Sequence, residues 1–436
     1  MKVFIQTLGC EKNTVDSENA AALLEKAGCS IVQTPEEADC FIVNTCGFIA
    51  DAKKQSIETI FDLSREKTAG KKLIVTGCLS QRYSSELSAE MPEVDAFLGV
   101  NDYQRLPEIV LGISSERTLC SGADKVYKEL GSRKLSTTPW SRSIKIAEGC
   151  SNICSYCAIP FIRGRYRSRR EEDVLREAEQ LAREGCKELV IIAQDVTFYG
   201  RDLGIKDALP QLLKKLCRIE GIRWIRLMYC YEDEITDSLI ETIRSEEKIC
   251  NYLDIPLQHC VDRILKAMNR KSTAESIEST VDKLRKLIPD IAIRTTLISG
   301  FPGETKEDAA KLLDFVEKTK FERLGAFAYS KEEGTRAAEL PGQVRKDVRE
   351  RRRDRIMELQ RRISLENNIK LIGKTLEVLV EEQDSENTYI GRSYMDAPEI
   401  DNSVIFTSSR PIQPGSFVNI RINDAFDYDL SGEAVY

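Results

Sequence analysis

Hydrophobic and polar positions alternate with two different periods along the first 110 residues. Short apolar runs predict buried strands, and they read KVFIQTLG, DCFIVNTC and KKLIVTGC. Between these runs, apolar residues recur every three or four positions up to Gly28 and Gly70, which predicts two helices that end at a glycine. Strands that alternate with helices usually form a parallel sheet. We therefore expect residues 1–115 to form a doubly wound, parallel α/β domain.

A second series of strand and helix patterns occupies residues 141–340. Its strand candidates are SIKIAEG, ELVIIAQD, IRWIRLMY, YLDIPLQ, IAIRTTLISG and RLGAFAYS. Six βα units are two fewer than a closed eight-stranded barrel has, which favours an open, partial (βα)6 barrel with its active site at the carboxyl ends of the strands. An amphipathic helix over 344–368 follows, so this domain is expected to span 136–368. The polar segment 112–140 is expected to be a linker.

The pattern becomes all-β after residue 368. Five short apolar runs follow within fewer than 70 residues, and they read LEVLVEE, TYIGRSYM, SVIFTS, FVNIRIN and DYDLSGEAV. This spacing is typical of a small five-stranded barrel of the oligonucleotide-binding kind. We therefore expect such a barrel over residues 369–436.

Composition narrows the class of protein. With 42% hydrophobic and 31% charged residues, the 436-residue chain is ordinary for a globular protein. No run approaches the roughly 18 apolar residues of a membrane helix, and the start lacks the features of a signal peptide. We therefore expect a cytoplasmic protein with no membrane partner. One His argues against most His-based catalysis, while 14 Cys in a reducing compartment favour metal ligation over disulfides.

Three cysteines at CxxxCxxC spacing form the strongest chemical motif, which we call the loop trio: Cys150, Cys154 and Cys157. They follow the first strand of the predicted barrel, where catalytic loops lie. Thiolates select zinc, copper(I) or iron–sulfur clusters, but zinc modules usually bring a second Cys pair or two His. The loop trio therefore favours a four-iron cluster with one iron left open to a cofactor or substrate. The alternative is a zinc knuckle with a remote fourth Cys.

Three further cysteines each lie just past the end of a predicted strand in the first domain. This sheet trio is Cys10, Cys46 and Cys78, with separations of 36 and 32 residues, each about one βα unit. Because parallel strands point the same way, the three thiols are expected at one edge of the sheet, where open α/β sheets bind ligands. A second cluster is one interpretation. Buried structural thiols are the other, and are expected for cysteines such as Cys29 and Cys217.

The motifs resemble those of the radical S-adenosylmethionine (SAM) methylthiotransferases along essentially the whole chain. TLGCEKNTVDSE, FIVNTCGF and VTGCLSQRY are similar to the family's N-terminal domain, and IAEGCSNICSYCAIPFIRGRYRSR is similar to its radical SAM signature. AQDVTFYG, YLDIPLQHCVDRILKAMNR, TTLISGFPGETKED and YSKEEGTRAA are similar to later motifs, and the C-terminal barrel resembles a TRAM domain. LGCEKN, AQDVTFYG and DAPEID most resemble the branch that modifies a ribosomal protein.

The resemblance implies two 4Fe–4S clusters and SAM as cofactors. The loop trio would bind a cluster whose open iron chelates SAM, which one electron cleaves to a deoxyadenosyl radical that removes hydrogen from an unactivated carbon. The sheet trio would bind an auxiliary cluster that supplies or presents sulfur, and a second SAM would supply the methyl group. An electron donor and a sulfur donor are implied partners. The protein would orient these groups and exclude water.

Three residues are candidates for contact with SAM. Tyr156 lies inside the loop trio and, by resemblance, near the adenine. Gln194 and Asp195 end the second barrel strand and are candidates for the amino-acid part of the cofactor. Packing around the site is the alternative role for all three.

A basic stretch follows the loop trio. Its members are expected to pair with carboxylates, to bind a substrate or to form a solvated surface, and the sequence leaves these three open. They are Arg163, Arg165, Arg167, Arg169 and Arg170.

Charge in the C-terminal barrel bears on the substrate. Residues 369–436 carry five basic residues against twelve acidic ones, which gives −7, numerically the net charge of the whole chain. Nucleic-acid binding depends largely on phosphate neutralisation, so the barrel is poorly suited to tRNA and well suited to a basic protein. We therefore favour methylthiolation of the β-carbon of an aspartate in small-subunit ribosomal protein twelve, where the residue type is implied by the resemblance.

Two other functions stay open at this stage. One is methylthiolation of the adenosine beside the anticodon of tRNA, which shares the same clusters and cofactor. The other is a non-catalytic metal-binding protein associated with ribosomes, which would contain zinc or iron without SAM chemistry.

Overall fold

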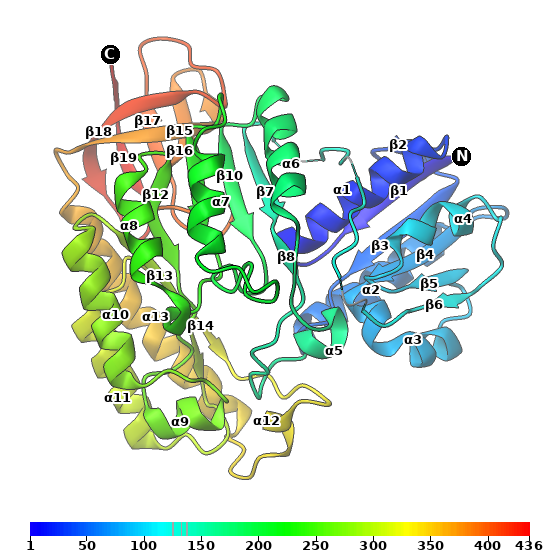
Figure 1. The fold of residues 1–436 in the computed structure, drawn as a ribbon, viewed down its shortest axis with the longest axis horizontal. Helices are drawn as coiled ribbons and strands as arrows, with labels where there is room; N and C mark the ends of the chain where they lie inside the picture. Colours follow the sequence, from blue (N-terminus) through cyan, green and yellow to red (C-terminus); the bar gives the residue numbers. More distant parts are fainter. Residues whose placement is uncertain (124–125, 132, 137) are drawn as a thin grey trace. The chain divides into compact units, whose positions relative to one another are not determined.

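The computed structural model describes every residue of the chain except 124, 125, 132 and 137 (Figure 1). The chain divides into two compact units. The first contains residues 1–137, 143–177 and 330–338, and the second contains 138–142, 178–329 and 339–436. Both cysteine trios belong to the first unit.

The first unit contains a six-stranded parallel sheet with the strand order β2-β1-β3-β4-β5-β6. This order reverses between β1 and β3, as in doubly wound folds that bind ligands at that point. The strands are β1 (Lys2–Thr7), β2 (Ser30–Val32), β3 (Cys40–Thr45), β4 (Lys72–Gly77), β5 (Ala96–Leu98) and β6 (Thr118–Leu119). The three predicted strands are confirmed. The other three have only two or three residues, too few to show a hydrophobic period, and β6 lies within the segment expected to be a linker.

Helices pack on both faces of this sheet, which confirms the doubly wound architecture. Helices α1 (Glu11–Lys26) and α4 (Leu106–Val110) share one hydrophobic core, in which Leu24 packs with Ile42. Helices α2 (Ala50–Glu66) and α3 (Cys78–Glu90) share a second core with Phe41. Successive residues of β3 thus point to opposite cores, as strand geometry requires. Figure 1 shows these helices around the blue and cyan strands.

The remaining part of the first unit surrounds the loop trio. A short antiparallel pair, β8 (Ala147–Glu148) and β9 (Arg167–Ser168), brackets the loop. Helix α5 (Ile159–Arg163) follows Cys157 closely and ends at Gly164, whose φ is +77°. The start of α12 (Arg336–Glu339) also belongs here, because Ala337 N donates to Ser155 O.

The second sheet follows chain order, β7-β10-β11-β12-β13-β14, and is open, which confirms the expected partial barrel of six strands. The pairs between β10 and β14 are parallel. Its strands are β7 (Ser141–Lys145), β10 (Glu188–Ile192), β11 (Trp224–Leu227), β12 (Ile249–Asp254), β13 (Ala292–Ser299) and β14 (Arg323–Ala328).

Helices alternate with these strands. They are α6 (Glu171–Arg183), α7 (Ala208–Leu216), α8 (Asp237–Ser245), α9 (Asp262–Ala267), α10 (Ala274–Leu287) and α11 (Lys306–Thr319). Thr273 and Thr305 begin α10 and α11 as capping boxes, which satisfy backbone N–H groups that a helix start leaves free. Helix α13 (Lys346–Ile369) follows and buries Ile356 and Ile363, which lie on its apolar face.

The C-terminal residues form a closed five-stranded barrel with the order β15-β16-β17-β19-β18, as expected. The strands are β15 (Thr375–Ser385), β16 (Thr388–Ser393), β17 (Val404–Thr407), β18 (Phe417–Ala425) and β19 (Leu430–Val435). Val378, Val380 and Phe406 fill its core, because alternate residues of each strand point inward. None of the helices in the described part of the chain is long and apolar enough to cross a membrane.

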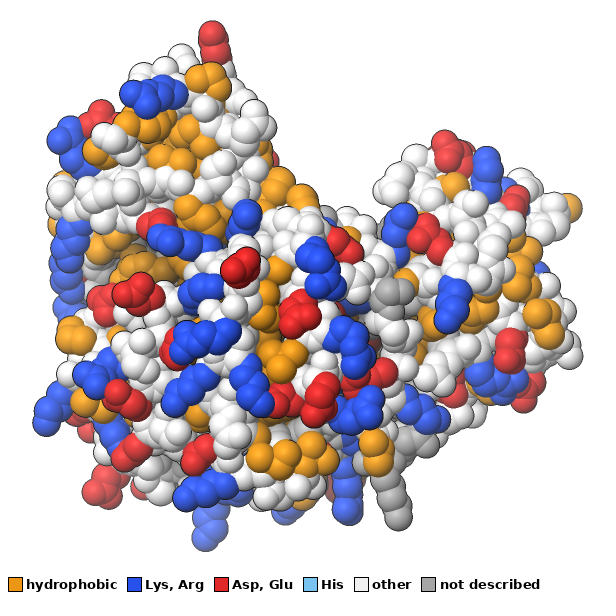
Figure 2. All heavy atoms as spheres, turned by 45° about the horizontal axis from the view of Figure 1, so that its top comes forward, with side chains coloured by type: hydrophobic (Ala, Val, Ile, Leu, Met, Phe, Trp, Pro, Cys, Tyr) orange, Lys and Arg blue, Asp and Glu red, His pale blue; other side chains and the backbone are white. Residues whose placement is uncertain are grey.

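Ion pairs inside the second unit bury barrel residues of both signs of charge. Glu188 at the start of β10 lies between Arg226 and Arg392, with its Oε1 2.8 Å from Arg226 Nε and its Oε2 2.6 Å from Arg392 Nη2. Arg323 Nη2 lies 2.6 Å from Asp396 Oδ1. Figure 2 shows Lys and Arg side chains intermingled with Asp and Glu on the face in view. The charge of the barrel sequence is therefore not all surface charge.

Candidate metal centre

The sheet trio lies at the carboxyl ends of three neighbouring strands. Cys10 immediately precedes α1 after β1, Cys46 follows β3, and Cys78 is the first residue of α3 after β4. Cys10 is exposed, Cys46 is half-buried and Cys78 is buried. Two of the three strands, β1 and β3, flank the point where the strand order reverses, the usual position of a ligand site in such a sheet.

Glycines allow the three turns to pack against one another. A Cβ on Gly9 would lie 2.9 Å from Cys46 Cβ and 3.2 Å from Cys46 Sγ. A Cβ on Gly47 would lie 2.7 Å from both N and Cα of Leu79 and 2.9 Å from the carbonyl carbon of Cys78. The turns of all three cysteines are thus in contact. In the sequence, the sign of this packing is a glycine directly beside each cysteine of the trio.

Gly47→Ala is expected to separate the Cys46 turn from the Cys78 turn, because the added methyl meets backbone that has no rotamer to change. Overpacking of this kind costs about 1–3 kcal/mol. We expect a lower free energy of unfolding in chemical denaturation and less iron after anaerobic reconstitution. Gly122→Ala is the matched control, since no heavy atom lies within 4 Å of its Cβ position. Equal iron and equal stability in both variants would contradict the tight packing described above.

The loop trio follows β8 directly. Cys150 and Cys154 are buried and Cys157 is half-buried. Two backbone hydrogen bonds shape the loop: Cys157 N donates to Cys154 O (3.1 Å), and Cys150 N donates to Gly164 O (3.1 Å). Burial raises the pKa of the Cys157 thiol, and the nearby Cys154 and Cys150 raise it further. The second bond ties the start of the loop to the end of α5.

The donors in both trios suit an iron–sulfur cluster better than a single ion. Among the described residues, no three His, Cys, Asp or Glu side chains form a group that could hold one metal ion. A four-iron cluster does not need such a group, because its thiolate ligands bind different irons. Three soft thiol donors in each trio match the ligands that such clusters take.

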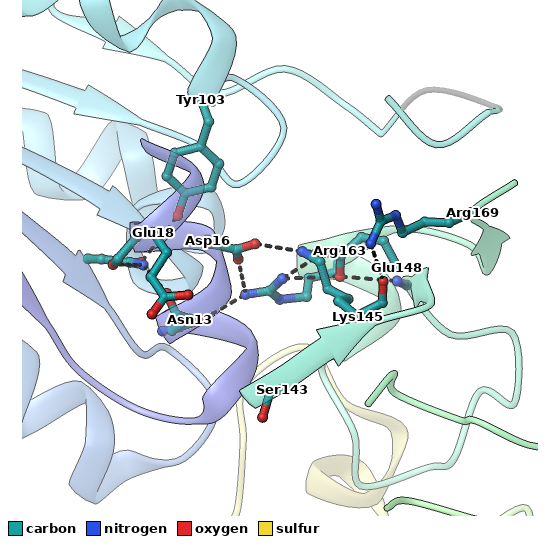
Figure 3. A network of polar contacts seen from close by, with 12 residues as sticks. Asn13, Asp16, Glu18, Tyr103, Ser143, Lys145, Glu148, Arg163 and Arg169 are labelled. Atoms are coloured by element: carbon teal, nitrogen blue, oxygen red, sulfur yellow. Dashed lines mark hydrogen bonds and ion pairs between the residues drawn. The ribbon is translucent and has the colours of Figure 1, made fainter. Parts of the chain in front are cut away.

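A buried polar network lies beside the sheet trio (Figure 3). Asn13 Nδ2 donates to Leu8 O (2.7 Å) and Thr45 O (3.1 Å), so one side chain joins the ends of β1 and β3. Lys145 Nζ lies 2.5 Å from Asp16 Oδ1 and 2.6 Å from Glu148 Oε2. Sequence reasoning missed these residues. The sequence marks Asn13 and Asp16 only as part of the polar run that begins α1. The burial of this run is visible only in the tertiary structure.

Arginines of the basic stretch pair with carboxylates, one of the three roles left open. Arg163 contacts Asp16 and Glu148, and Arg169 contacts Glu129 and Glu177. Both arginine side chains are buried, whereas Arg165 and Arg170 are exposed. The periodicity of the stretch did not distinguish buried from exposed members, because the segment runs through a short helix, a turn and a two-residue strand.

A second ion network lies near both trios. Arg82 Nη1 donates to Gly47 O (3.0 Å), next to Cys46, and lies 3.2 Å from Glu332 Oε2. Lys53 Nζ lies 2.7 Å from the same oxygen. Arg82 also lowers the pKa of Cys157, against the larger effect of burial. A positive charge thus lies near a cysteine of each trio.

The three SAM candidates fall in different units. Tyr156 is half-buried in the turn between Cys154 and Cys157, in the first unit. Gln194 and Asp195 lie just after β10, in the second unit, and Asp195 is buried. Asp195 Oδ1 accepts from Thr197 Oγ1 (2.6 Å) and Phe198 N (3.2 Å), so this oxygen serves the turn after the strand.

Comparisons with known proteins match this architecture module by module. Residues 2–99 match the uncharacterized protein family UPF0004, residues 144–316 the radical SAM superfamily, and residues 372–435 the TRAM domain. The radical S-adenosylmethionine methyltransferase TsrM from Kitasatospora setae, solved with cobalamin and a [4Fe-4S] cluster, shares the fold with a TM-score of 0.56. It is 15% identical, over 75% of this chain and 72% of that one. The class is thus a radical SAM protein with a TRAM domain.

Relatives of full length define the family. The ribosomal protein uS12 methylthiotransferase RimO of Clostridioides difficile is 49% identical over 100% of this chain and 99% of its own length. RimO of Thermoanaerobacter sp. is 48% identical over 99% of both chains. This chain belongs to the RimO family of radical SAM methylthiotransferases.

Proposed function

We propose that this protein transfers a methylthio group to the β-carbon of an aspartate in ribosomal protein uS12. The observation that carries the proposal is the presence of two cysteine trios in one unit, in a chain that matches RimO along its whole length. The sheet trio lies at three packed turns, and the loop trio lies in one loop. The sequence motifs favoured the same branch of the family. A ribosomal substrate would place the reaction in the cytoplasm.

The two trios would each hold one 4Fe–4S cluster. The loop trio would hold the cluster that binds SAM, and the sheet trio would hold the cluster that presents sulfur. When bound, the clusters and SAM supply a radical able to remove hydrogen from carbon, together with the sulfur and methyl groups that are transferred. The count of two is supported by three soft donors in each trio and by the glycine contacts that pack the sheet trio's turns together.

The protein's own residues would orient these groups and exclude water from them. Cys150, Cys154 and Cys78 are buried, so their sulfurs lie away from bulk solvent. Tyr156, beside the loop trio, would contact the adenine of SAM. Gln194 and Asp195 would face the amino-acid part of SAM. One carboxylate oxygen of Asp195 already accepts hydrogen bonds within the turn after β10. An external electron donor and a sulfur donor would complete the reaction.

Charge at the tip of one barrel hairpin supports a basic protein substrate over tRNA. Glu382, Asp384 and Glu386 are exposed around the turn between β15 and β16. Other barrel acids, such as Asp396, form buried ion pairs with arginines and do not face solvent. The hairpin thus offers negative charge where a basic partner can reach it, which favours encounter with that partner and repels phosphates.

The direct test compares substrates. The anaerobically reconstituted protein is incubated with SAM, a reductant and a sulfide source, and with either uS12 or tRNA. We expect a mass gain of one CH₃S group in place of hydrogen, on an aspartate of uS12 and not on tRNA. Modified tRNA with unmodified uS12 would overturn the choice of substrate.

Metal content tests the non-catalytic alternative. Two 4Fe–4S clusters require about eight irons per chain. A brown anaerobic preparation with this iron content would exclude the non-catalytic alternative if it also cleaves SAM on reduction. About one zinc per chain, with no iron, is what a structural metal module would contain.

A further inference from the structure

Two consecutive residues at the end of α5 contact one cysteine of each trio. Arg163 Nη2 donates to Cys78 Sγ at 3.4 Å, and Gly164 O accepts from Cys150 N at 3.1 Å. All of these residues lie in the first unit. Figure 3 shows Arg163 reaching from the end of α5 toward α1. The end of this short helix is thus a physical link between the sheet trio and the loop trio.

The guanidinium group of Arg163 is held on every side. Besides Cys78, Nη2 lies 2.8 Å from Asn13 Oδ1 and 3.0 Å from Asp16 Oδ2. Nη1 lies 3.1 and 3.0 Å from the two carboxylate oxygens of Glu148. The side chain is only 2% exposed. A planar guanidinium with several fixed acceptors has one available orientation, so Nη2 stays beside the sulfur and shares its two N–H groups among Asn13, Asp16 and Cys78.

Formal charges in this network balance before the cysteine is counted. Asp16 and Glu148 supply two negative charges, and Lys145 and Arg163 supply two positive charges. The sulfur of Cys78 therefore lies beside a network without excess charge, and Arg163 is the cation in it that donates to this sulfur.

We propose that Arg163 is a positioning residue that holds the Cys78 sulfur and raises the reduction potential of the cluster bound by the sheet trio. The inference rests on the proposed function, in which that cluster exists. Reduction adds negative charge to a cluster, and a hydrogen bond or cation at a ligand sulfur stabilises the more negative state. Because Gly164 fixes Cys150, the same helix end also sets where the loop trio begins.

The test isolates the sheet-trio cluster in the full-length chain. Cys150, Cys154 and Cys157 are all replaced by Ala, and the remaining cluster is titrated anaerobically by EPR. In this background, Arg163→Met with Glu148→Gln removes one buried cation and one buried anion together, which limits damage to the fold. We expect the ratio of reduced to oxidised cluster, at the unsubstituted potential, to fall at least tenfold, or about 59 mV for one electron.

A matched control removes a similar pair elsewhere in the unit. Arg169→Met with Glu177→Gln removes a buried arginine and its carboxylate, which are 2.6 Å apart. This variant is expected to keep both its iron and its potential. Arg163→Lys keeps the positive charge but loses the planar set of N–H donors, and it is expected to lower the reduction potential by a smaller amount. This variant is measured if the double variant loses its iron.

The outcomes separate the inference from the proposed function. A lowered potential in the Arg163 variants, but not in the control, supports the inference. An unchanged potential in Arg163→Lys and in the double variant overturns it and leaves the two-cluster proposal intact. A chain that binds no iron when only the sheet trio remains would instead overturn the second cluster itself.

Discussion

Cys10→Ala and Cys150→Ala are each expected to halve the iron bound after anaerobic reconstitution. Each substitution removes one of three thiolates from one trio, and two thiolates hold a 4Fe–4S cluster poorly. Of about eight irons per chain, about four would remain in each variant, and the two variants would lose different EPR signals. Iron and acid-labile sulfide analysis measures the loss.

The control for this loss is a cysteine outside both trios. Cys29→Ala removes a buried thiol that packs in the core beside α1, and it is expected to keep all the iron. Wild-type iron in Cys10→Ala would rule out the sheet trio as a cluster site. Loss of all the iron in either variant would indicate that the chain holds a single cluster.

Glu188→Gln is expected to cost about 3 kcal/mol of unfolding free energy, because it removes the carboxylate beside buried Arg226 and leaves Arg392 paired only with Glu381. Arg226 and Glu188 are fully buried and Arg392 is nearly so. Chemical denaturation of the apo protein measures the loss. Glu241→Gln, which breaks an exposed pair with Arg244, is the control and is expected to leave stability unchanged.

The Glu188 carboxylate also predicts how the free energy of unfolding depends on pH. Burial raises the pKa of Glu188, but the charges of Arg392 and Arg226 outweigh burial and lower it from 4.5 to about 2. A depressed pKa gives stability that is fully present above the unfolded value, and that is lost as pH falls from about 4.5 toward 2. Glu188→Gln should flatten this part of the acid unfolding curve, and an identical pH slope in both proteins would contradict the assignment.

The net charge of the barrel sequence does not give the charge that its surface presents to a partner. The excess of −7 over residues 369–436 favoured a basic partner. The structure shows that Asp396 is paired with Arg323, and Glu377 with Arg223, from elements outside the barrel. The exposed acids of the hairpin, Glu382, Asp384 and Glu386, still favour a basic partner, but they carry less charge than the full count of the barrel. Sequence position alone does not tell which charges meet in space.

The order of elements and the positions of both cysteine trios could be predicted from the sequence. Period-2 and period-3.6 patterns are local, and parallel strands place their carboxyl ends at one edge whatever the details of packing. The six-stranded open sheet and the five-stranded closed barrel are as expected. The strands that were missed, β2, β5, β6 and β9, have two or three residues each and are too short to carry a period.

Only the tertiary structure decided what surrounds the cysteines. Arg163 and Cys78 are 85 positions apart in sequence, and Asn13 joins strand ends that are 37 residues apart; no local pattern encodes such pairings. Buried polar groups must find partners as the chain folds, and those partners come from whichever elements the packing brings close. The sequence thus specifies the six thiols, and long-range packing specifies the charges and hydrogen bonds that act on them.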